Sequence, residues 1–398
     1  MSEEKVKPFD SFTVVYKVLI WTGFYKMLNP PKNRFIYICY QTYRLYVFLV
    51  VVGFNLSHLI FIVQNLHNMD YLSDTLIIEI PQLNLFVKCI IYVPLLYLRL
   101  NALSADPIFA ANSKKDEELL RENIIFMRRV WSLIHTSVSI TALTKLNYYS
   151  KKKIYRVFLG VHTTASTGVM LSYNYVIIDC LLRYTCTVLL EVFPVFWTGY
   201  GHLALDCLVA TYYAQAEVQL KIIKYNLEHL FDANGSADSV ADSNHRYKDV
   251  YDTDVKKRFV HYVQRYQKLA CLWKYVKLKY LALINTCHFQ THILSVPFVF
   301  LFVYLLIILT EVFLYCYFGN LVQYESQSVV TALYLSNWQS TSPKFRRILF
   351  IAMLCWSRTL APTVSGIVPL SLDTFVTILK SAYSLYAVNC SLVGSKQQ

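Results

Sequence analysis

Long apolar runs recur along the whole chain and constrain its fold more than any other feature. A helix needs roughly 20 mostly apolar residues to cross a bilayer. Seven runs approach this length, at about 43–64, 76–98, 124–146, 175–209, 272–294, 296–318 and 364–392. The chain of 398 residues is 56% hydrophobic and only 16% charged, below the charge of ordinary soluble domains. The sequence therefore predicts an all-α membrane protein with seven transmembrane helices.

Lysine and arginine in the short connections predict the orientation. Cytoplasmic connections carry an excess of these residues, and most of them fall inside the cell if the N-terminus is cytoplasmic. Lys151–Lys153 is an exception, because this topology places it outside. Seven crossings then make the C-terminus extracellular, the reverse of G-protein-coupled receptors. The net charge of +13 is explained by topology rather than by binding to nucleic acid.

The predicted spans divide the chain into six sections. In order, these are a cytoplasmic N-terminal segment (1–42), spans one to four (43–209), a polar cytoplasmic section (210–271), spans five and six (272–319), a second cytoplasmic section (320–361), and the last span with its tail (362–398). Within the first polar section, helix-like periodicity flanks a middle, 232–254, that is rich in Asp, Ser and Asn. We predict a disordered loop there, between two cytoplasmic helices.

No pattern for catalysis or metal binding is found. The CxxC, HExxH, GxSxG, GxGxxG and P-loop spacings are all absent, so we predict no enzyme, no cofactor and no metal site. An alternative is a polytopic enzyme that uses an intramembrane histidine such as His135, His288 or His292. No acid or nucleophile accompanies these histidines at a useful spacing.

A series of motifs near the C-terminal end is specific. It comprises Phe313-Leu-Tyr-Cys-Tyr-Phe-Gly-Asn320, Glu325-Ser326, Ala332-Leu-Tyr334, Trp338, Val368-Pro-Leu-Ser-Leu-Asp-Thr-Phe375 and Ser381-Ala-Tyr-Ser384. In this order the motifs resemble the signature of the insect odorant receptors. The chain lacks the long second cytoplasmic insertion typical of the coreceptor, so it resembles a tuning subunit.

The resemblance implies a function and a set of partners. A volatile small molecule would bind in the transmembrane bundle and gate a nonselective cation channel. The channel would be a tetramer formed with odorant receptor coreceptor subunits, in the plasma membrane of olfactory sensory neurons. Sections 210–271 and 320–361, the latter with the first half of helix seven, would form a cytoplasmic anchor between subunits. A G-protein-coupled chemoreceptor is the alternative, disfavoured by the orientation and by the absence of DRY-like and NPxxY-like sequences.

The last span holds the candidate pore residues. Ser384, Val388, Ser391 and Leu392 are spaced three or four apart or adjacent, which places them on one helix face. Motif matching implies that Val388 and Leu392 occupy the gate, where four copies would form an apolar ring that blocks ions by dewetting. Lipid contact or packing explains the spacing equally well. Lys380, on the same helix, should face water or an acidic partner.

The resemblance also places a ligand pocket among the outer halves of helices two to six. A volatile ligand needs an apolar cavity with few polar anchors. The candidates are Phe86, Ile90, His135, Ser139, Leu182, Cys186, His288 and His292. Ordinary packing is the alternative for each.

Two further groups of residues have alternative interpretations. The aromatic residues Tyr324, Tyr334 and Trp338 are predicted to contribute to the contact between subunits, with a solvated surface as the alternative. The other charges inside predicted spans are candidates for function, although salt bridges between helices would explain them as well. These are Lys88, Arg183, Glu191 and Glu311.

Overall fold

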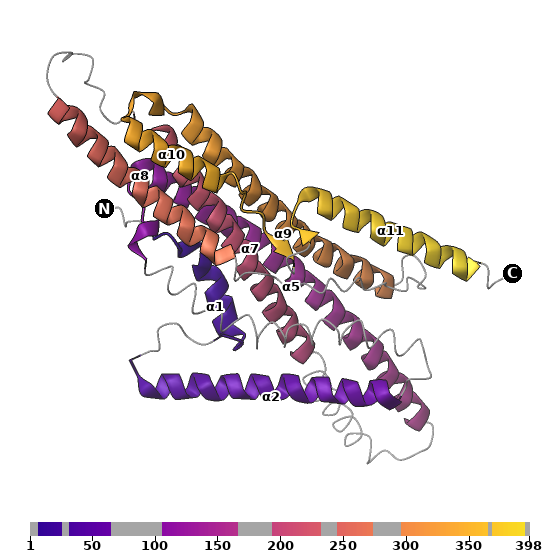
Figure 1. Ribbon diagram of the computed structural model, residues 1–398. Coiled ribbons are helices and arrows are strands. Elements are labelled where there is room, and N and C mark those ends of the chain that lie inside the picture. Colours follow the sequence, from indigo (N-terminus) through magenta and orange to yellow (C-terminus); the bar gives the residue numbers. More distant parts are fainter. Residues whose placement is uncertain are drawn as a thin grey trace.

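Long α-helices make up most of the computed structural model (Figure 1). The structure describes residues 7–25, 32–64, 106–165, 193–231, 245–273, 296–364 and 368–394. The long helices are α2 (Arg34–Gln64), α5 (Lys114–Ala165), α7 (Phe193–Glu228), α8 (His245–Trp273), α9 (Val296–Leu335) and α11 (Leu372–Gly394). The shorter elements are η1 (Asp10–Phe12), α1 (Thr13–Trp21), η3 (Pro107–Phe109), η6 (Trp338–Ser340), α10 (Pro343–Trp356), β1 (Thr363–Val364) and β2 (Val368–Pro369).

Helix α7 lies at the centre of the molecule, between α5 and α9 (Figure 1). Its side chains are buried on nearly every face from Leu203 to Ile223, the pattern of a helix surrounded by other helices. At one end of this bundle, α10 packs against both α8 and α9. Helix α11 contacts α9 and extends away from the bundle toward the C-terminus (Figure 1).

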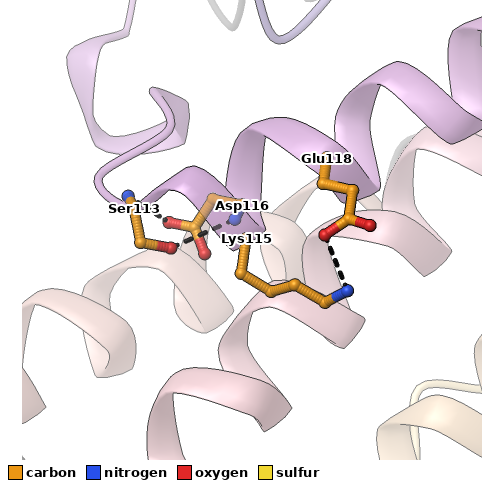
Figure 2. Close-up of polar contacts among 4 residues, drawn as sticks. All are labelled: Ser113, Lys115, Asp116 and Glu118. Carbon is orange, nitrogen blue, oxygen red and sulfur yellow. Dashed lines mark hydrogen bonds and ion pairs between the residues drawn. The ribbon is translucent and has the colours of Figure 1, made fainter.

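The start of α5 is fixed by Ser113 and Asp116 (Figure 2). The backbone N–H of Asp116 donates to Ser113 Oγ at 3.1 Å, and the backbone N–H of Ser113 donates to Asp116 Oδ2 at 3.3 Å. This reciprocal pair is a capping box. Asp116 is buried and also accepts from Asn226 Nδ2 at 2.9 Å, so the cap holds α5 against α7. Lys115 and Glu118 form an ion pair of 2.8 Å on the exposed side (Figure 2).

Helix α2 has the length and apolar composition needed to cross a membrane, and within the described ranges it alone passes that test. Many of its large apolar side chains are exposed, as expected for a surface that faces lipid. They include Leu45, Phe48, Leu49, Leu56, Ile60 and Val63.

Three other predicted spans coincide with helices that have different limits. Helix α5 contains the span 124–146, and α7 contains the end of the span 175–209, the start of which lies outside the described residues. Helix α9 contains the span 296–318 but has 40 residues. At about 1.5 Å per residue it is about 60 Å long, twice the roughly 30 Å of hydrocarbon in a bilayer. Spans 76–98 and 272–294 lie outside the described residues.

The last helix begins later than the sequence suggested. We predicted a span from Val364, but Val364 pairs with Val368 in a short antiparallel hairpin and α11 begins at Leu372. Pro369 restricts the residue before it to extended backbone, which excludes a helix there. Ser371 then caps the helix, because its Oγ accepts from the Thr374 backbone N–H at 3.2 Å.

Helix α8 begins earlier than we predicted. Helix α8 begins at His245, inside the 232–254 section that we expected to be disordered. Asp254 and Arg258 form an ion pair of 3.4 Å one turn apart, and Val255 is fully buried. A polar composition therefore did not prevent a helix here, because the helix continues into a stretch that packs against the bundle from Val255 onward.

Candidate ligand-binding site

A cavity of about 170 Å³ lies among α5, α7 and α9. Its apolar lining consists of Ile134, Leu203, Cys207, Ala210, Leu306 and Leu314. Its polar lining consists of Ser137, Asp206, Thr310, Glu311 and Tyr315. An apolar cavity of about 150 Å³ can hold benzene, so this one accommodates a molecule of similar size.

Asp206 is the centre of the polar end of the cavity. Its side chain is only 4% exposed. Tyr315 Oη donates to Asp206 Oδ1 at 2.7 Å, and His202 Nδ1 lies 2.6 Å from Asp206 Oδ2. The ligand atoms of His202, Asp206 and Glu311 all lie within 4.8 Å of one another. This set of a nitrogen and carboxylate oxygens can bind a cation, and a divalent metal ion would use the same atoms.

Sequence spacing explains how these side chains meet. His202 and Asp206 are four residues apart on α7, and Glu311 and Tyr315 are four apart on α9. Residues at this spacing share one helix face, and α7 packs against α9. The sequence analysis noted Glu311 only as an intramembrane charge and did not select Asp206 or Tyr315. Two polar pairs at helical spacing inside apolar runs were the available signal.

Two predicted pocket residues lie beside the cavity on α5. His135 and Ser139 neighbour the lining residues Ile134 and Ser137, but they contact Tyr200 of α7 instead. Ser139 Oγ and Tyr200 Oη are hydrogen-bonded at 2.5 Å, and the His135 and Tyr200 rings meet edge to face at 5.2 Å. The other predicted pocket residues lie outside the described residues, namely Phe86, Ile90, Leu182, Cys186, His288 and His292.

A second polar network joins α8, α7 and η3. Arg265 of α8 is fully buried, and its Nε and Nη2 donate to Gln219 Oε1 at 2.8 and 2.5 Å. Nη2 also donates to the Phe109 carbonyl at 3.2 Å. Burial lowers the pKa of the Arg265 guanidinium to about 10. These bonds replace the water that Arg265 loses, so the network fastens the helices together.

None of the predicted pore and interface residues is among the residues that line the cavity. Ser384 and Lys380 are exposed on α11, which also contains Val388, Ser391 and Leu392, whose side chains the structure does not describe. In the section 320–361, which we predict to be cytoplasmic, Tyr324 and Tyr334 are exposed and Trp338 is half-buried. Trp338 Nε1 donates to the Tyr334 carbonyl at 3.0 Å.

Comparison with known proteins identifies the family. The family model described as 7tm Odorant receptor matches residues 96–383, well over half of the chain. The chain belongs to the odorant receptor family. The receptor is 43% identical to Odorant receptor 19a of Drosophila melanogaster over 82 residues, 20% of this chain and 21% of that protein. It is 34% identical to the odorant receptor coreceptor of Aedes aegypti over 87 residues, 21% of this chain and 18% of that one. These alignments span only about a fifth of the relatives' length.

Solved structures share the fold over nearly the whole receptor. The insect olfactory receptor OR5 from Machilis hrabei matches with a TM-score of 0.69 at 12% identity, covering 95% of this chain and 96% of that one. The same receptor in complex with eugenol matches with a TM-score of 0.63 at 12% identity, covering 96% and 97%. The predicted family and the seven-transmembrane helical fold are confirmed. Membership of a receptor family sets aside the polytopic enzyme.

Proposed function

We propose that this receptor is a tuning subunit that binds a volatile odorant and gates a nonselective cation channel. Its partners would be odorant receptor coreceptor subunits in a tetramer, in the plasma membrane of olfactory sensory neurons. The observation that supports this best is the largely apolar cavity among α5, α7 and α9, which has a few polar groups at one end. In our topology its residues on α7, and most of those on α9, fall in the inner halves of spans 175–209 and 296–318, deeper than the outer halves in which we expected the pocket. The complex of Machilis hrabei OR5 with eugenol supports odorant binding by this fold. The similarity to the Aedes aegypti coreceptor supports a channel.

Gating requires no chemical reaction in this proposal. A ligand shifts a channel toward the open state when it binds that state more tightly than the closed one. Helix α9 lines the cavity with Glu311 and continues to Gly319, where a Cβ would lie 2.6 Å from the Leu370 carbonyl oxygen. Leu370 stands just before α11. A displacement of α9 therefore reaches the helix to which we assign the pore.

The pore assignment rests on α11. We assign Ser384, Val388, Ser391 and Leu392 to the pore face, through which cations would pass. Helix α11 projects from the bundle (Figure 1) and exposes Tyr383 by 73%. A helix of this composition needs lipid or other subunits around it, and a tetramer in a bilayer supplies both.

Subunit contact is assigned to the surface formed by the end of α9 and by α10. Leu335 and Leu354 there are 75% and 74% exposed. Our topology puts this surface beyond the bilayer, in water, where a large apolar patch indicates a protein interface. Tyr324 and Tyr334 are exposed on α9, and the Trp338 ring contacts Phe350 of α10. All three are assigned to the same contact.

Whole-cell recording tests the function. Cells expressing this chain with an insect coreceptor should give a nonselective cation current in response to members of a panel of volatile esters, terpenes, alcohols and amines. Cells expressing this chain alone should give none. A pair of chains that reach the surface without co-precipitating would contradict the assignment as a tuning subunit.

Accessibility of terminal tags separates the channel from a G-protein-coupled receptor. On intact cells an antibody should reach a C-terminal tag and miss an N-terminal one, which becomes accessible after permeabilisation. The opposite labelling would favour the G-protein-coupled alternative.

A further inference from the structure

We propose that the cavity among α5, α7 and α9 selects small volatile amines, which bind as ammonium ions between Asp206 and Glu311. This inference rests on the proposed function, because it names the class of odorant that the receptor would detect. It is carried by the hydrogen-bonding character, the charge and the volume of the cavity.

The polar lining presents acceptors to a ligand. Three hydroxyl groups line the cavity, and each donates its single hydrogen within the protein. The bonds run from Tyr315 Oη to Asp206 Oδ1 (2.7 Å), from Thr310 Oγ1 to the Leu306 carbonyl (2.7 Å), and from Ser137 Oγ to the Ile134 carbonyl (2.8 Å). Carboxylates only accept when ionised, and an ammonium group only donates. The lining therefore matches an amine better than an ester or a ketone, which offers acceptors alone.

The charge of the lining points the same way. Two of its residues are the acids Asp206 and Glu311, and the described lining includes no Lys or Arg. One imidazole faces these two carboxylates, because His202 Nδ1 lies 2.6 Å from Asp206 Oδ2 and within 4.8 Å of Glu311, and a carboxylate among apolar side chains is costly without a compensating charge. Coulombic attraction is also stronger inside a protein than in water. A bound ammonium ion would add a second cationic group beside Asp206 and Glu311, whereas a neutral alcohol would add none.

The volume of the cavity limits the size of the hydrocarbon part of the ligand. About 170 Å³ is slightly more than the cavity of about 150 Å³ that holds benzene. An ammonium group with a hydrocarbon of about six carbons fills that space. Leu203, Leu306 and Leu314 provide the apolar contact for the hydrocarbon. Cyclohexylamine has the required size and charge, and cyclohexanol is its neutral counterpart.

The test compares these two compounds on the receptor with its coreceptor. We expect cyclohexylamine to evoke current at a concentration about tenfold lower than cyclohexanol, because a charged hydrogen bond exceeds a neutral one. Glu311→Gln should raise the amine concentration for half-maximal current by about tenfold or more and leave the response to cyclohexanol within about twofold. Glu118→Gln, on the exposed side of α5 (Figure 2), is the matched control and should change neither response.

Binding of radiolabelled cyclohexylamine to the full chain in nanodiscs tests amine binding separately from the channel proposal. Amine binding that Glu311→Gln abolishes supports the inference, even if no panel member evokes current and the channel proposal fails. Current evoked by esters or alcohols from a receptor that does not bind cyclohexylamine overturns the inference and leaves the channel proposal intact. Zinc binding that depends on Glu311, without amine binding, would also overturn it.

A second variant covers the case in which Glu311→Gln fails to reach the surface. Ala210→Val narrows the cavity and keeps its charge. It should weaken the binding of cyclohexylamine more than that of the smaller propylamine. Equal effects on the two amines, or none on either, would place amine binding elsewhere.

Discussion

Asp206 illustrates how this receptor holds a charged side chain among apolar helices. The side chain is nearly inaccessible and is bonded by residues from two helices, Tyr315 on α9 and His202 on α7. Replacing a hydrogen-bond donor to a buried carboxylate costs about 1.5–3 kcal/mol. We expect Tyr315→Phe to reduce the free energy of unfolding by about this amount, measured by thermal unfolding in detergent. Tyr317→Phe, on the same helix, should have little effect, and equal losses would contradict the role of the Asp206 bond.

The environment of His261 on α8 predicts that the stability of the receptor depends on pH. Burial, with a smaller contribution from Arg265, lowers the pKa of His261 from its usual 6.5. Its Nε2 lies 3.2 Å from Asn112 Nδ2, which suits a neutral ring that accepts a hydrogen bond. The unfolded chain therefore binds a proton at a higher pH than the folded chain does. This contribution to stability is present above about pH 6.5 and is lost as the pH falls below it.

The measurement is the thermal unfolding temperature between about pH 7.5 and pH 5.5. The temperature of the wild-type receptor should fall further than that of His261→Gln, which has no titrating group at this position. Parallel curves for the two proteins would show that His261 does not titrate as we expect.

At the scale of whole elements, α9 lies in close contact at Gly319 with Leu370, just before α11. A Cβ at this position would lie 2.6 Å from the Leu370 carbonyl oxygen and 2.7 Å from the Leu370 Cβ. We expect Gly319→Ala to separate α9 from the hairpin before α11, at a cost of about 1–3 kcal/mol. Surface expression and odorant-evoked current should both fall. Gly53→Ala on α2, where a Cβ meets nothing within 4 Å, is the control, and a similar loss there would contradict a contact effect.

Hydropathy located the helices better than it located their ends. A window of apolar residues finds the part of a helix that lies in lipid and misses polar extensions. The capping box at Ser113 and Asp116 was readable, but it precedes the apolar run of α5 by more than two turns. The prediction that the last helix starts at Val364 was wrong because apolar residues also form short strands. Only Pro369 and Ser371 distinguish a strand from a helix here.

The candidate site was predictable in part. The four-residue spacings of His202 with Asp206 and of Glu311 with Tyr315 stand in the sequence. The cavity depends on which faces of α5, α7 and α9 meet, and a single sequence does not contain that information. His135 was selected from the place that the family resemblance gives the pocket, whereas its contact with Tyr200 depends on the packing of α5 against α7.

At the scale of the whole molecule, the exposed apolar surface of α10 leads us to expect that it contacts another subunit. Leu354 is largely exposed on α10 although it is apolar. We expect Leu354→Asp to reduce co-precipitation with the coreceptor severalfold, because it would bury a charge in the interface. The unfolding temperature of the isolated chain should not change. Thr13→Asp adds the same charge at an exposed polar position of α1, outside the assigned contact, and should not affect association. An equal loss there would exclude a specific contact at Leu354.

The continuity of α9 has a mechanical consequence. Glu311 and Gly319 are separated by eight residues of one uninterrupted helix, about 12 Å along its axis. A hydrogen-bonded helix of this length bends little, so it acts as a stiff rod whose two points move together. A ligand that pushes the rod sideways by a fraction of an ångström would shift Gly319 against Leu370 by a comparable distance. The current would then depend on how far a bound odorant displaces α9. Two ligands of equal affinity can therefore differ in the current that they evoke.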